Sequence, residues 1–83
     1  MRVIGELPHP DFKITIFLWN NRYLIKIEHG YLEQTYKIDQ FDLEEKDLKN
    51  MVDKEFLDQV SDRFQAMHKS LQEALQRVEN QTN

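Results

Sequence analysis

The chain contains no cysteine, so neither a disulfide framework nor a thiol nucleophile contributes to its fold or chemistry. Glycine and proline occur only twice each, a composition that argues against a disordered tail or a repeat array. No apolar run approaches the roughly 18 residues of a membrane span, and the apolar stretch in residues 1–8 is too short for a signal peptide. We therefore expect a cytoplasmic protein that does not enter a membrane.

The composition is that of one ordinary globular domain over residues 1–83, with 40% hydrophobic residues. A domain of this length buries only about 60% of its surface, so self-association is the remaining way to add stability. The net charge of −4 is uneven, because residues 1–38 hold five basic and four acidic residues whereas residues 39–83 hold six and eleven. An acidic chain is poorly suited to tight, nonspecific binding of duplex nucleic acid.

In residues 12–19 every second position is apolar, which is typical of a strand with one buried face. Apolar side chains at the even positions point one way, and the odd positions point the other. Asn20-Asn21 then suits a two-residue turn, because asparagine tolerates positive φ. This turn predicts a register in which apolar residues oppose each other and lysine opposes glutamate: Trp19–Arg22, Leu18–Tyr23, Ile16–Ile25, Ile14–Ile27 and Lys13–Glu28.

Two more strands complete the predicted sheet. The next turn is expected at His29-Gly30, and as a two-residue loop it would pair Ile27 with Leu32, Lys26 with Glu33 and Tyr23 with Tyr36. A short first strand is expected over residues 2–7, ended by two prolines that cannot donate to a ladder. Residues 1–38 thus predict an antiparallel meander of four strands.

From residue 39 onward the spacing of apolar residues changes from two, which is typical of strands, to three and four, which is typical of helices. Residues 39–52 are expected to be a connector with a short helix that Asp42 caps, with one apolar face formed by Leu43, Leu48, Met51 and Val52. Asp53 is expected to cap a long helix over residues 53–80, and residues 81–83 to fray. The predicted fold class is α+β, a four-stranded antiparallel β-meander packed on one face by the short helix and the long C-terminal helix.

The long helix carries apolar residues at spacings of three and four, which places them on one face: Leu57, Val60, Phe64, Met67, Leu71, Ala74 and Val78. A helix of this length measures roughly 40 Å, whereas a compact domain of this size has a radius of gyration near 12 Å. We expect the first half to lie on the sheet and the second half to overhang. The overhang predicts a homodimer interface, formed by Leu71, Ala74, Leu75 and Val78.

The outer face of the sheet, which points away from the helices, is the second candidate. It is expected to carry aromatic and basic side chains, with Glu28 and Glu33 as its acids. Bases stack on aromatic rings while cations follow the phosphates, so this face suits single-stranded nucleic acid. Phe17 with Leu24 also fits an ordinary satellite cluster or a dimer patch. The candidate residues are Phe17, Trp19, Arg22, Leu24, Lys26 and Tyr31.

The order of elements, four strands followed by a helix, resembles that of the positive-cofactor single-stranded-DNA-binding proteins. The resemblance is one of topology, and it implies binding of single-stranded DNA.

No motif predicts catalysis or a cofactor. The three histidines, His9, His29 and His68, lack the close spacing of zinc ligands, and the chain has neither a glycine-rich phosphate loop nor a nucleophile signature. We therefore expect no metal, no cofactor and no enzyme. The leading hypothesis is a small non-catalytic protein-interaction or oligomerisation module, and the alternative is a single-stranded nucleic-acid-binding protein.

Overall fold

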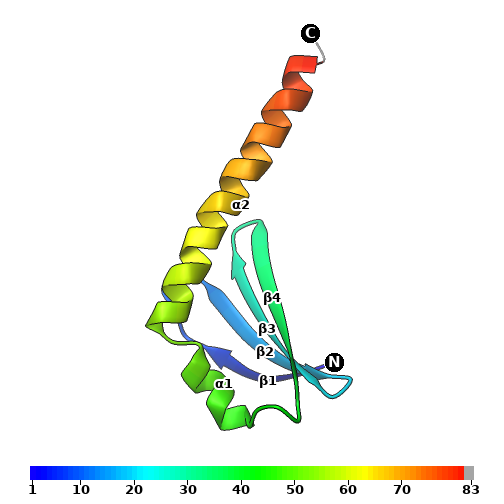
Figure 1. The fold of residues 1–83 in the computed structure, drawn as a ribbon, viewed down its shortest axis with the longest axis vertical. Coiled ribbons are helices and arrows are strands. Elements are labelled where there is room, and N and C mark those ends of the chain that lie inside the picture. Colours follow the sequence, from blue (N-terminus) through cyan, green and yellow to red (C-terminus); the bar gives the residue numbers. More distant parts are fainter. Residues whose placement is uncertain (82–83) are drawn as a thin grey trace.

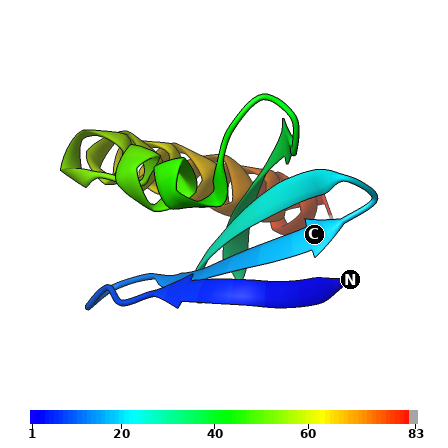
Figure 2. The same cartoon turned by 90° about the horizontal axis from the view of Figure 1, so that it is seen from below.

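The computed structural model describes residues 1–81 as an antiparallel sheet followed by two helices (Figures 1 and 2). Both helices cover the same face of the sheet, here called the inner face. The predicted α+β meander is therefore confirmed. The strands are ordered β1-β2-β3-β4 and the elements are β1 (Arg2–Leu7), β2 (Lys13–Trp19), β3 (Arg22–His29), β4 (Leu32–Asp39), α1 (Glu45–Met51) and α2 (Lys54–Gln81).

The β2–β3 hairpin has the predicted register. Asn20 and Asn21 adopt φ values of 51° and 62°, as a two-residue type I′ turn requires at both central positions. Every expected pair is present, from Trp19 opposite Arg22 to Lys13 opposite Glu28. The local preference of asparagine for left-handed backbone thus determines which residues face each other along the whole hairpin.

The β3–β4 turn differs from the prediction by one position. The two-residue loop is Gly30-Tyr31 rather than His29-Gly30. Gly30 has φ of 61° at the first loop position, which is where a type II′ turn needs glycine. The partners therefore move by two residues, a shift that leaves each side chain on its face. The observed pairs are Ile27–Gln34, Lys26–Thr35 and Tyr23–Ile38.

The core lies between the inner face of the sheet and the two helices. Ile25, Ile27, Leu48 and Val60 are completely buried, and burying one such side chain contributes roughly 1.5–3 kcal/mol. The predicted apolar faces of β2, β3, α1 and the first half of α2 all meet here. The buried cluster is Ile14, Ile16, Tyr23, Ile25, Ile27, Leu48, Val52, Val60 and Phe64.

Gln34 is a buried polar residue of this inner face, and it connects β4 to α2. Its amide nitrogen donates a hydrogen bond to the Val60 carbonyl at 3.0 Å. Its amide oxygen accepts hydrogen bonds from the Tyr36 hydroxyl at 2.7 Å and from Arg63 Nε at 3.1 Å. Because both ends of the amide are satisfied, Gln34 is buried without an unpaired polar group.

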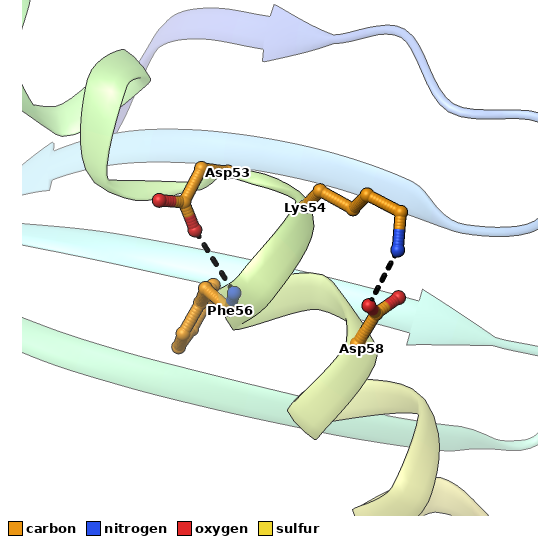
Figure 3. A network of polar contacts seen from close by, with 4 residues as sticks. All are labelled: Asp53, Lys54, Phe56 and Asp58. Carbon is orange, nitrogen blue, oxygen red and sulfur yellow. Dashed lines mark hydrogen bonds and ion pairs between the residues drawn. The ribbon is translucent and has the colours of Figure 1, made fainter.

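The two helix starts follow different rules. Asp53 accepts a hydrogen bond from the Phe56 amide at 2.9 Å, so it caps α2 as predicted (Figure 3). Lys54 and Asp58 form an ion pair in the same first turn. The predicted cap of α1 is wrong, since α1 starts after Glu44 and has no side-chain cap. Asp42 instead belongs to a turn, where its amide donates to the Asp39 carbonyl.

The molecule is elongated because α2 continues past the sheet (Figure 1). The helix has 28 residues and includes Gln81, which was expected to fray; residues 82–83 of the expected frayed tail lie outside the described residues. The radius of gyration is 15.9 Å and the principal extents are 54 × 27 × 19 Å, against the roughly 12 Å radius of a compact domain. Neither helix within residues 1–81 is apolar enough over a sufficient length to cross a membrane.

Candidate functional site

The projecting half of α2, residues 69–81, stands clear of the sheet in Figure 1. Its three large apolar side chains remain accessible, with Leu71 38%, Leu75 49% and Val78 58% exposed. In the half of α2 that lies on the sheet, Val60 and Phe64 are 0% and 4% exposed. Within residues 1–81 nothing covers the projecting half as the sheet covers the first half, so its apolar surface is available to a partner.

The exposed residues continue the face that contacts the sheet. Spacings of three and four residues place Phe64, Met67, Leu71, Ala74 and Val78 on one side of the helix. We call Leu71, Ala74, Leu75 and Val78 the apolar stripe; Ala74 is half-buried by its own helix neighbours. The stripe is therefore the uncovered end of a single apolar face.

The projecting half does not need the sheet in order to be helical. Residues 69–81 contain no glycine or proline, and they are rich in the strong helix formers alanine, leucine, glutamine, glutamate, lysine and arginine. Lys69 and Glu73 add an ion pair one turn apart at 4.0 Å. The sequence can thus present the stripe as a preformed helix.

A shallow groove between β4 and α2 leads to the stripe. Its volume is about 730 Å³. It is continuous with the stripe because Leu71 belongs to both. The side chains that line it come from one strand and one helix: Leu32, Gln34, Thr35, Tyr36, Arg63, Ala66, Met67, Ser70 and Leu71.

The outer face of the sheet is more acidic than expected. Register places Glu6 opposite Thr15 and Asp39 opposite Arg22, so both acids join Glu28 and Glu33 on this face. The acidic and basic side chains are then equal in number. The acidic ones are Glu6, Glu28, Glu33 and Asp39, and the basic ones are Lys13, Arg22, Lys26 and Lys37.

Lys26 is engaged by acids of its own face. Its ammonium lies 3.4 Å from a Glu33 oxygen and 3.6 Å from a Glu28 oxygen. The hydrogen bond to Glu33 and the charge of Glu28 raise the pKa of Lys26 above its ordinary value of 10.5. This cation is therefore occupied by carboxylates rather than available to phosphates.

The candidate residues of the outer face differ in accessibility. Trp19 is 46% exposed and Arg22 lies opposite it in the register, also exposed. Phe17 is half-buried, and Leu24 is only 7% exposed, so Leu24 contributes packing rather than a contact surface. The expected continuous aromatic platform is reduced to Trp19 and the half-covered ring of Phe17.

Tyr31 does not lie on the outer face, contrary to the prediction. It occupies the β3–β4 loop, and its hydroxyl is hydrogen-bonded to His68 Nδ1 of α2, with the two ring centroids 5.9 Å apart. The loop position follows from the register, because the glycine turn begins one residue later than expected. Tyr31 thus belongs to the helix side of the molecule.

The three histidines gather at the same end of the molecule, although they are distant in sequence. Phe12 stacks on His9 with centroids 4.7 Å apart and meets His29 edge-on at 5.4 Å. His9 Nδ1 accepts hydrogen bonds from two backbone amides at 3.1 and 3.2 Å, which makes it a structural cap of its loop. Among residues 1–81 no group of three histidine or carboxylate side chains is arranged to hold a metal ion.

A half-open pocket of about 540 Å³ lies at this end, between the β3–β4 turn, the β1–β2 loop and α2. The side chains that line it include two phenylalanines and two histidines: Phe12, Phe64, His29 and His68. His29 Nδ1 is hydrogen-bonded to the Asp11 carbonyl at 3.1 Å, and His68 Nδ1 is hydrogen-bonded to the Tyr31 hydroxyl. The pocket has no converging charged groups that specify a ligand.

No protein-family model, no curated protein and no solved structure matches this chain. The likeness to the positive-cofactor single-stranded-DNA-binding proteins therefore remains one of element order. The function must therefore be inferred from the two surfaces described above, the apolar stripe of α2 and the outer face of the sheet.

Proposed function

We propose that the protein is a non-catalytic interaction module that self-associates through the apolar stripe of α2. One observation carries the proposal. Leu71, Leu75 and Val78 are 38–58% exposed on a helix that continues past its own sheet. Soluble proteins generally cover such a contiguous apolar face in an assembly.

A second copy of the chain is the partner that best fits the stripe. The charged side chains of the projecting half balance, so this segment adds no repulsion between two copies and offers a strongly charged partner no complementary field. A domain with so small a core also gains stability from self-association. The charged residues are Lys69, Glu73, Arg77 and Glu79.

The association should be weak and depend on concentration. Four apolar side chains from each copy form a contact at the low end of interface sizes, below about 1,200 Å² in total. Part of the stripe is already shielded by its own helix, which reduces the apolar area that dimerisation removes from water. We therefore expect a monomer–dimer equilibrium rather than a permanent dimer.

Sedimentation over protein concentrations of roughly 10 μM to 1 mM tests this proposal. The wild-type chain should move from monomer to dimer, and Leu75→Glu should abolish the shift because it places a charge in the stripe. Gln76→Glu is the matched control, since it adds the same charge at the next, exposed position of the same helix. Circular dichroism should show equal helix content in all three proteins. A wild-type chain that remains monomeric throughout contradicts the proposal.

The charges of the outer face weigh against the alternative, single-stranded nucleic-acid binding. Basic and acidic side chains are equal in number there, and Tyr31 belongs to the other side of the molecule. Trp19 is the only tryptophan, so its fluorescence reports directly on this face. We expect no change on addition of a single-stranded oligonucleotide at low salt. A saturable change that disappears at high salt would restore the alternative.

A further inference from the structure

The face of α2 that contacts the sheet is also the face that carries the stripe. Val60 and Phe64 pack on the inner face of the sheet, and Leu71 and Val78 follow them on the same side of the helix. A partner helix that covers the stripe must therefore approach from the side on which the sheet lies. The sheet limits the directions in which that helix can run.

A parallel partner helix does not fit in this space. Packed helix axes lie 8–10 Å apart, and a parallel partner would carry its own first half alongside the first half of α2. The inner face of the sheet already occupies that side of α2, from Val60 to Met67. Each sheet would thus collide with the other copy.

An antiparallel partner helix fits, because its first half and its sheet lie beyond the end of α2. Figure 1 shows no part of residues 1–81 beside the projecting half on either side. Full overlap of two stripes in opposite directions sets Leu71 against the partner's Val78 and Ala74 against the partner's Leu75. The last turn of each helix then reaches the mouth of the groove between β4 and α2, near Met67.

We infer that two copies of the chain join tail to tail about a two-fold axis, with the projecting halves antiparallel and the two sheets at opposite ends. This inference rests on the proposed self-association and adds its geometry. The interface is isologous, so each copy contributes the same residues. From the 54 Å length of one copy and the 1.5 Å rise per residue, the dimer should be roughly 90 Å long.

Disulfide cross-linking tests the direction, and the absence of native cysteine makes single-cysteine variants unambiguous. Leu71→Cys and Val78→Cys are mixed, one of them carrying a mass tag, and oxidised. Antiparallel pairing should give mixed covalent dimers at least about fivefold in excess over either homodimer, since like positions lie roughly 10 Å apart along the axis, beyond the reach of a disulfide. Gln76→Cys, on the exposed opposite face, should not cross-link.

The outcomes separate the two proposals. Homodimers of Leu71→Cys and of Val78→Cys in place of the mixed product contradict the antiparallel geometry and leave self-association intact. A chain that is monomeric in sedimentation contradicts both proposals. A dimer without any of these cross-links also contradicts both, because its interface lies elsewhere. Small-angle scattering of the unmodified dimer gives an independent measure, and a longest dimension of about 60 Å, close to that of one copy, would contradict the tail-to-tail arrangement.

Discussion

The two halves of α2 carry the same apolar pattern and have opposite surroundings. In the first half, Val60 and Phe64 are buried under the sheet, whereas in the projecting half Leu75 and Val78 are about half exposed. The spacing of three and four residues predicts an apolar face in both halves. Helical periodicity therefore specifies a face that must be covered, and the size of the sheet determines how much of that face the chain covers itself.

The largest loss of stability is expected from removing the Phe64 ring in the first half of α2, here called the covered half because it lies on the sheet. Phe64→Ala should lower the free energy of unfolding by about 3–5 kcal/mol, because it leaves a cavity among buried side chains. Leu75→Ala should change it by less than about 1 kcal/mol when measured at low concentration, where the chain is monomeric. Urea unfolding followed by circular dichroism gives both values. Equal losses would show that the two halves are equally part of the core.

The next effect concerns the polar connection between β4 and α2. Gln34→Ala should cost about 1–3 kcal/mol, since it leaves the Tyr36 hydroxyl and Arg63 without their shared acceptor. The control is Thr35→Ala, an exposed neighbour that points to the outer face, with an expected change within about 0.5 kcal/mol. Urea unfolding at low concentration measures both. A neutral Gln34→Ala would mean that apolar packing alone holds α2 on the sheet.

A smaller loss of stability is expected from removing the cap at the start of α2. Asp53→Ala removes the hydrogen bond to the Phe56 amide (Figure 3) and should cost about 1 kcal/mol. Asp42→Ala is the matched control, because Asp42 caps no helix, and it should change stability by less than about 0.5 kcal/mol. Thermal unfolding at one protein concentration compares the two. A larger loss in Asp42→Ala would restore the predicted cap of α1.

The smallest effect on folding should come from removing the projecting half entirely. Truncation after Ser70 removes the stripe and should leave a folded monomer whose free energy of unfolding lies within about 0.5 kcal/mol of that of the full chain at low concentration. Association in sedimentation should disappear. A truncated chain without strand signal in circular dichroism would show that the overhang is required for folding.

The two hairpin turns explain where prediction from the sequence succeeded and where it failed. Asn20-Asn21 permits one two-residue turn, so the register of β2 and β3 was predicted correctly. A single glycine permits two loops, with Gly30 as the second or the first residue, and the type II′ choice was not anticipated. That choice also moved Tyr31 from the outer face to the side of His68.

The outer face was misjudged for a related reason. Glu6 and Asp39 lie outside the strand pair that defines this face, and only the registers of β1 and β4 place them on it, with Glu6 opposite Thr15 and Asp39 opposite Arg22. The cluster of His9, Phe12, His29 and Phe64 was also invisible to local patterns. Contacts between distant segments depend on how the strands and α2 cross, which sequence spacing does not report.

The strands and helices of this protein and their apolar faces follow from its sequence, because backbone preference and side-chain period are properties of neighbouring residues. The sequence also determined that α2 is too long for its domain, since helix length follows from residue number alone. The overhang of the second half was likewise predicted, but where the sheet ends, near Met67, and the 38–58% exposure of Leu71, Leu75 and Val78 are seen in the folded chain alone. A side chain is buried only where a second surface contacts it, and the sequence of a helix does not specify how far that second surface extends.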